Sequence, residues 1–151
     1  MSKLEHQQFI FGSILLLSNK LQLLGDQVTK ELTLKQWFLL NLISNMENKH
    51  PNFMEVAKVM GTSRQNVSKM LSVLEKKGMV DVKPSNADHR AIYVELTQQS
   101  LDYFESMEQA GNDLLTDIFS NFQPEEIEQL ATSLERMMTT IEMKLKKQER
   151  K

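Results

Sequence analysis

The apolar residues in the middle of the chain change their spacing at one glycine, Gly78, and this change limits the possible folds more than any other feature. Before Gly78 apolar residues recur every three or four positions, which is the period of a helix. In the runs MVDVKP and AIYVELT after it they alternate, which is the period of a strand. The intervening SNADHR is rich in turn residues, so the sequence predicts an antiparallel hairpin.

Two short helices are predicted immediately before this hairpin. The motif NFME predicts a capped helix over 53–60, and Gly61 ends it in the position that favours a left-handed backbone. The motif TSRQ predicts a second cap, made by Thr62 and Gln65, for a helix over about 63–77. Two helices joined by a tight turn and followed by a hairpin are typical of a winged helix-turn-helix, so the predicted fold is mainly α with a small β-hairpin wing.

The second of these helices has one apolar face and one face suited to nucleic acid. Leu71 and Leu74 fall within about 40° of Val67 on a helical wheel, and amides, hydroxyls and lysines point the other way. Amide and basic side chains can bond base edges in the major groove. The residues that we expect to contact DNA are Thr62, Ser63, Arg64, Gln65, Asn66, Ser68 and Lys69, together with Lys83, Asp88, His89 and Arg90 of the hairpin.

Within this set the sequence separates phosphate contacts from base contacts. Arg64 lies about 60° from the apolar stripe, which suits a phosphate at the groove edge. If Gln65 is occupied by capping, base reading falls to Asn66, Ser68 and Lys69. At the hairpin tip, an arginine in the minor groove would be held by the carboxylate of Asp88, although such a pair also fits a plain surface turn.

The distribution of charge supports a polyanion on one part of the chain. The formal net charge is −2, yet residues 58–90 hold seven basic and three acidic side chains. From Glu95 to Glu135 there are ten acidic side chains and no lysine or arginine. Each run alone could be a solvated surface, but together they suggest one face that attracts nucleic acid and another that repels it.

Long helices are predicted on both sides of the winged helix-turn-helix. Their apolar stripes are wide, and so small a module could not bury them all, so we expect a homodimer built from the flanking helices; a monomer whose flanking helices cover one another is the alternative. The expected segments are residues 1–32 and 98–151 for dimerisation and 33–97 for DNA binding. The expected dimer contacts are Ile10, Ile14, Leu17, Leu130, Leu134, Met137 and Ile141.

The motifs, in this order and spacing, resemble the MarR family of bacterial transcription regulators. The resemblance rests on LTLKQWFLL, on VAKVMGTSRQNVSKMLSVLEKKGMV, on DHR with VELT, and on QPEEIEQLATSLERM. It implies a homodimer, assembled from the first and last helices, that binds a pseudo-palindromic operator. We expect a repressor, although the sequence itself leaves repression and activation both open. Ser68 and Lys69 match the family's hydroxyl-plus-basic pair, Arg90 its wing arginine, and Asp88 that arginine's partner.

The resemblance also implies release from DNA by a small aromatic or amphipathic ligand. Phe11 and Trp37 could line its cavity, with core packing as the alternative role. The chain has no cysteine, so thiol oxidation cannot be the signal. Two departures from the family pattern bear on the wing: Ser85-Asn86-Ala87 replaces a second D-x-R, and Val82 replaces an arginine for which Lys83 could substitute.

Other classes of function find little support. His6, His50 and His89 are far apart, and no phosphate loop, nucleophile motif or metal-ligand spacing occurs, so we predict neither an enzyme nor a cofactor or metal. No apolar run is long enough to span a membrane, and no signal peptide is evident, which favours the cytoplasm. A helical dimer that binds a ligand or a protein without specific DNA binding remains the alternative.

Overall fold

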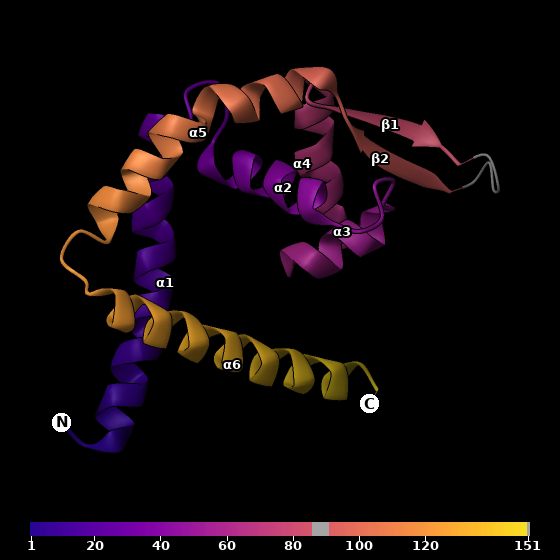
Figure 1. Ribbon diagram of the computed structural model, residues 1–151. Coiled ribbons are helices and arrows are strands. Elements are labelled where there is room, and N and C mark those ends of the chain that lie inside the picture. Colours follow the sequence, from indigo (N-terminus) through magenta and orange to yellow (C-terminus); the bar gives the residue numbers. More distant parts are fainter. Residues whose placement is uncertain (86–90, 151) are drawn as a thin grey trace. The chain divides into compact units, whose positions relative to one another are not determined.

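The computed structural model describes residues 1–85 and 91–150. Along the chain lie α1 (Lys3–Val28), α2 (Leu34–Asn45), α3 (Phe53–Met60), α4 (Arg64–Lys76), β1 (Val80–Pro84), β2 (Ile92–Leu96), α5 (Gln98–Ile118) and α6 (Pro124–Glu149) (Figure 1). The predicted mainly α fold with one hairpin is therefore confirmed. Two compact units divide the chain, residues 1–108 and residues 109–151.

The core of the first unit is built by α2, α3, α4 and the hairpin. Leu39 and Leu40 of α2, Leu71 and Leu74 of α4, and Val94 of β2 are all fully buried. Capping boxes begin α1, α2 and α3. The side chains of Ser2, Thr33 and Asn52 each accept a backbone N–H, and the glutamate or glutamine three residues later accepts the N–H of the cap residue. The sequence predicted the caps at Thr33 and Asn52, and both are confirmed.

The hairpin is a two-stranded antiparallel sheet in which Val82 stands opposite Val94. Val80 and Val94 point inward and are fully buried, as the alternating pattern predicted. A further backbone bond joins β2 to the loop before α3, where the N–H of Val94 donates to the carbonyl of Pro51 at 2.9 Å. This bond places His50 and Pro51 beside the outer edge of β2.

The turn between α1 and α2 is fixed to the winged helix-turn-helix by side chains from two other helices. The Lys77 ammonium, at the end of α4, donates to the Glu31 carbonyl at 2.7 Å. The Tyr103 hydroxyl of α5 donates to the buried Thr29 carbonyl at 2.5 Å. Lys30, between these two carbonyls, has a left-handed backbone with φ 53°. These bonds hold the C-terminus of α1 against the DNA-binding module within one unit.

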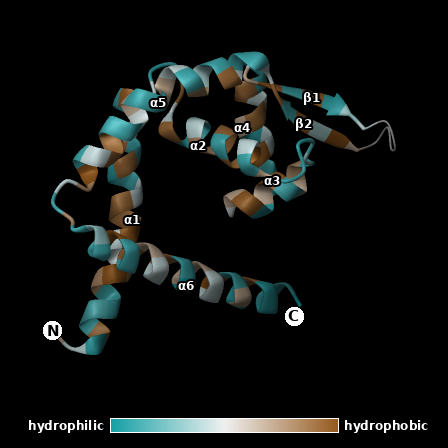
Figure 2. Cartoon of the chain, viewed as in Figure 1, coloured by the Kyte–Doolittle hydropathy of each residue, from teal (hydrophilic) through white to brown (hydrophobic). Residues whose placement is uncertain are grey.

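The flanking helices bury very little of their apolar surface. In α1 only Gly25 is buried, and within α6 no residue is buried. Figure 2 shows apolar residues along both helices. In the second unit the rings of Phe119 and Phe122 pack edge to face in the turn before α6. No helix among residues 1–85 and 91–150 is long and apolar enough to cross a membrane.

Candidate DNA interface

A glycine turn sets the angle between α3 and α4. Gly61 has φ 72°, and its N–H donates to the carbonyls of Ala57 and Lys58, which satisfies the end of α3. Ala57 is buried and small, so the two helices can cross closely. The opposite helix buries Val67 and Leu71 completely. The outward face of α4 is thus presented by a rigid pair of helices.

The cap of α4 differs from the prediction. The N-cap is Ser63, not Thr62, and the Ser63 hydroxyl accepts the N–H of Asn66 at 3.1 Å. The predicted pairing of Thr62 with Gln65 is therefore wrong. Two neighbouring hydroxyl residues could each have capped the helix, and the left-handed Gly61 brings the second of them into the extended backbone that an N-cap needs.

This shift of one residue reverses the expected roles of two amides. The side-chain amide of Asn66 donates to the Thr62 hydroxyl at 3.0 Å and lies 4.0 Å from the Met70 sulfur. The side chain of Gln65 is exposed and makes no hydrogen bond with any other described residue. From the sequence, Gln65 was expected to cap the helix and Asn66 to contact the bases. In the structure the uncommitted amide belongs to Gln65.

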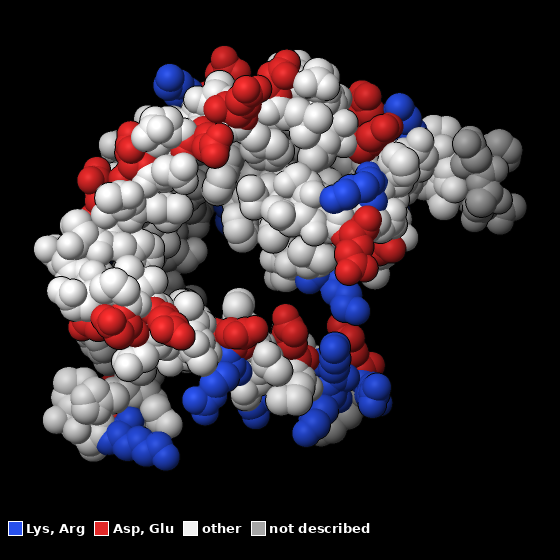
Figure 3. Space-filling model, in the orientation of Figure 1, with Lys and Arg blue, Asp and Glu red and all other residues white. Residues whose placement is uncertain are grey.

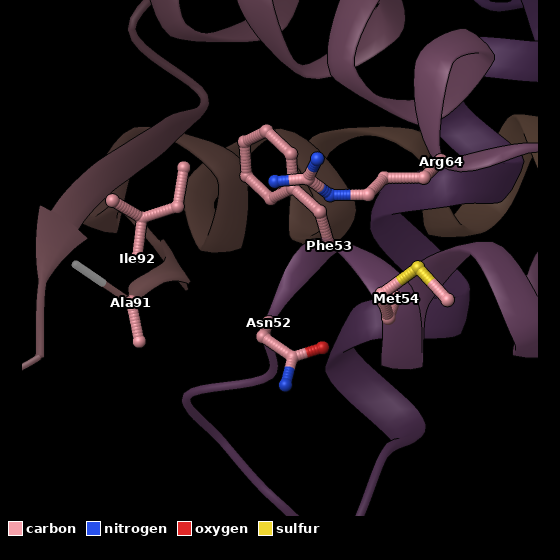
Figure 4. Close-up of a pocket in the computed structure, with 6 residues that line it drawn as sticks. All are labelled: Asn52, Phe53, Met54, Arg64, Ala91 and Ile92. Carbon is pink, nitrogen blue, oxygen red and sulfur yellow. The ribbon is translucent and has the colours of Figure 1, made fainter. Parts of the chain in front are cut away.

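The predicted contact residues of α4 lie together at the start of the helix. Ser63, Arg64, Gln65, Asn66, Ser68 and Lys69 are exposed, and Thr62 is half-buried. Arg64 also borders a cavity of about 180 Å³. Figure 4 shows this cavity between the starts of α3 and α4 and the first residues of β2, lined by Asn52, Phe53, Met54, Arg64, Ala91 and Ile92. Arg64 thus lies where α4 meets the hairpin.

In the wing, Lys83 is paired within the chain. Its ammonium lies 2.8 Å from Glu95 Oε2, and this bond raises the pKa of Lys83 and lowers the pKa of Glu95. His50 Nε2 lies 3.6 Å from the other carboxylate oxygen of Glu95. Asp88, His89 and Arg90 lie outside the described residues, so their roles stay a prediction.

Sequence reasoning missed Glu95 and His50 as neighbours of the wing lysine. It counted Glu95 only as the start of the acidic segment. The signal for Glu95 was present in the hairpin pattern, because Lys83 and Glu95 alternate with apolar residues that face the core, so both must point outward. The sequence held no comparable signal for His50, which reaches the hairpin from a separate loop.

Charged side chains gather on different segments of the surface. Acidic side chains follow one another along α5, and Lys144, Lys146, Lys147 and Arg150 gather at the end of α6 (Figure 3). The predicted dimer contacts Ile10, Ile14 and Leu17 are exposed on α1, and Leu130, Leu134 and Ile141 are exposed on α6. Phe11 is 70% exposed and Trp37 is half-buried.

Known proteins resemble this chain in both sequence and structure. The sequence profile of the MarR family matches residues 30–91, the segment that holds α2, the helix-turn-helix and the hairpin. A MarR protein from Peptoclostridium difficile is 27% identical, with a TM-score of 0.80 over 89% of this chain and 88% of that one. Residues 30–91 are thus similar to the MarR family.

Two further solved structures share the fold over almost the whole chain. A mutant MarR from E. coli, complexed with operator DNA, has a TM-score of 0.78 at 22% identity over 91% of this chain and 99% of its own. An organohalide-sensing transcriptional regulator in its 2,4-dichlorophenol-bound form has a TM-score of 0.78 at 15% identity, over 93% and 82%. These structures share the fold of this chain, and its winged helix-turn-helix lies in the segment that matches the MarR family.

Proposed function

We propose that the chain binds a pseudo-palindromic DNA operator as a homodimer and represses transcription there. The observation that carries this proposal is the exposed start of α4, where Gln65, Ser68 and Lys69 stand on a helix whose other face is buried. A helix presented in this way fits the major groove. The E. coli MarR of the same fold is complexed with operator DNA, which supports the same use here.

Each residue has a proposed role in this interface. Gln65, Ser68 and Lys69 read base edges, because amide, hydroxyl and ammonium groups bond them directly. Arg64, which lies beside both α4 and the hairpin, contacts a DNA phosphate. Thr62 and Ser63 hold the start of α4 against the DNA backbone. Lys83, Asp88, His89 and Arg90 form the wing contact.

Apolar surface that a single chain leaves uncovered supports the proposed homodimer. The apolar residues of α1 and α6 are exposed along most of both helices. Exposed apolar patches of this extent mark sites of association. A two-fold dimer also sets two α4 helices against two half-sites about one duplex turn apart. A small aromatic effector is part of the proposal, with Phe11 and Trp37 as candidate lining, and the dichlorophenol-bound relative supports it.

Selection of bound sequences from a random duplex pool tests DNA binding and symmetry together. We expect a palindrome whose half-sites are about ten base pairs apart, and an affinity that falls steeply with salt. Lys69→Ala with Arg90→Ala should abolish specific binding. Lys20→Ala, which removes an exposed lysine from α1, is the matched control. Unchanged operator affinity of the double variant would show that this face does not bind DNA.

The effector is tested on the same complex. Titration of 2,4-dichlorophenol into the protein–operator complex should release the DNA, and Trp37→Leu should raise the concentration needed. If the Trp37→Leu variant releases DNA at the same dichlorophenol concentration as the wild type, Trp37 does not line the effector pocket. No release by any of a panel of phenols would remove the phenolic effector from the proposal.

A further inference from the structure

The outward face of the hairpin carries a cluster of charged and titratable side chains. In the register Asp81 stands opposite Glu95 and Lys83 opposite Tyr93, so all four point away from the core. His50, from the loop before α3, packs edge-on against the Tyr93 ring with centroids 4.9 Å apart. The cluster thus joins the wing to a loop that precedes the helix-turn-helix.

Glu95 lies between the Lys83 ammonium and the His50 imidazole. One carboxylate oxygen is 2.8 Å from the Lys83 ammonium, and the other is 3.6 Å from His50 Nε2. The side chains of Lys83 and Glu95 are 47% and 34% exposed, so a phosphate can approach them. A DNA phosphate that binds Lys83 must therefore either lie close to the negative charge of Glu95 or displace that carboxylate from the ammonium.

We propose that Glu95 competes with the DNA phosphate for Lys83 and so weakens operator binding, and that protonation of His50 relieves this competition. The inference rests on the proposed function, because it requires Lys83 to contact DNA. Glu95 is a tuning residue in this account. It touches no DNA, and it acts through the ammonium that it holds.

The pH dependence follows from the charges around His50. The charged and titratable groups on the strand side of His50 are Asp81, Lys83, Tyr93 and Glu95. On its own segment lie Lys49 and Glu55. Glu55 is linked to His50 by Asn48, whose side chain donates to Glu55 and accepts the N–H of His50. With neutral His50 the two carboxylates outnumber the Lys83 ammonium by one charge. With protonated His50 the charges balance. Imidazole changes its charge between about pH 5 and 8, so DNA binding should strengthen as pH falls through that range.

The first arm of the test measures affinity for the selected operator at pH 8 by fluorescence anisotropy. Glu95→Gln should tighten binding about two- to fivefold, the range set by exposed ion pairs. The slope of log K against log salt should steepen by about 0.9, because Lys83 then displaces one more counterion. Weaker binding by Glu95→Gln would show that Glu95 positions Lys83 for DNA, and would overturn the proposal.

Two variants separate competition for Lys83 from simple repulsion of DNA. In the Lys83→Gln background, Glu95→Gln should give no gain, because the contested ammonium is gone. An equal gain in that background would overturn the proposal. Asp81→Asn makes the same change of charge on the same face without removing the bond to Lys83, and it should give the smaller gain. Circular dichroism confirms that each variant is folded.

The second arm compares affinities at pH 6 and pH 8. The gain of the wild type at pH 6 should shrink in His50→Asn and in Glu95→Gln. His6→Asn is the control, because that histidine lies on α1, outside the proposed DNA contacts, and the gain at pH 6 should persist in it. Full pH dependence in His50→Asn would overturn the role of His50. A wild type without salt-sensitive affinity for any duplex would instead refute the proposed function itself.

Discussion

Gly61 shows how one backbone angle positions the DNA-binding helix. Its φ of 72° strains any residue with a Cβ, although a Cβ there would meet no atom within 4 Å. We expect Gly61→Ala to lower the free energy of unfolding by about 1–2 kcal/mol, through backbone strain alone. Urea denaturation monitored by circular dichroism measures it.

The matched control is Gly111→Ala in the interior of α5. A Cβ there also meets nothing within 4 Å, but the backbone is helical. The change should raise the free energy of unfolding by about 0.5–1 kcal/mol. Equal effects of the two substitutions would show that the left-handed turn is not the source of the cost.

The uncommitted amide of Gln65 gives a prediction about base reading. If Gln65 bonds an adenine in a bidentate manner, Gln65→Ala should cost about 1–3 kcal/mol of binding and relax the preference at one position of each half-site. Asn66→Ala should change that preference less, because the Asn66 amide is bonded to Thr62. Repeated selection with each variant measures both, and a relaxed position for Asn66→Ala alone would reverse the assignment.

At this scale the sequence predicted the kinds of residue but not their partners. It placed a cap at the start of α4, yet two hydroxyl residues in a row satisfied the same pattern. The choice between Thr62 and Ser63 depends on where the Gly61 turn points the chain. As a consequence, the Asn66 amide is bonded within the chain and the Gln65 amide is left for DNA, the reverse of the expected roles. A pattern of residue types does not contain this information.

Among elements, the contact of α1 with α2 depends on a glycine. A Cβ at Gly25 would lie 2.5 Å from Leu34 Cδ2 and 2.8 Å from its Cγ. We expect Gly25→Ala to lower the free energy of unfolding by about 1–3 kcal/mol, because the Leu34 side chain or the helix that carries it must shift. Adding Leu34→Ala should recover part of that loss. Full additivity of the two substitutions in urea denaturation would contradict a direct clash.

The bond from α5 to the α1–α2 turn makes stability depend on alkaline pH. Burial, with a smaller effect of Glu31, raises the pKa of Tyr103 to about 12 from its ordinary 10.0. The protonated phenol is favoured in the fold, so its contribution is complete below pH 10 and is lost as pH rises through 12. Tyr103→Phe should flatten stability across that window, which urea titrations between pH 9 and 12 measure. An unchanged alkaline slope would assign it to another group.

The elements themselves were predictable because their apolar residues keep one period over many positions. The helix-turn-helix and the hairpin match the expected segments within a few residues. The long-range contacts were not predictable. The Lys77 bond to Glu31 and the Tyr103 bond to Thr29 join residues 46 and 74 positions apart, and no local pattern records such a meeting.

For the whole molecule, the proposed homodimer predicts that folding and association are coupled. Leu134 is 39% exposed on the apolar stripe of α6, while Thr132 lies about 160° away around the same helix. Leu134→Glu should yield monomers and a lower melting temperature, and Thr132→Glu should change neither. Analytical ultracentrifugation decides between them.

Concentration provides an independent check on the same prediction. The melting temperature of the wild type should rise with protein concentration, because association stabilises the folded chain by mass action. Leu134→Glu should remove that dependence. A wild-type melting temperature that does not change over a hundredfold range of concentration would favour the monomer whose flanking helices cover one another.

The single backbone bond between Pro51 and Val94 has a consequence for how crowded copies of the chain behave. An open strand edge recruits strands from other molecules, and proteins guard against this with loops, charges or proline. Here the loop that carries His50 covers β2, and the ring of the buried Pro51 has no N–H with which to continue a ladder. The wing can therefore remain a two-stranded hairpin at high concentration without seeding intermolecular sheets.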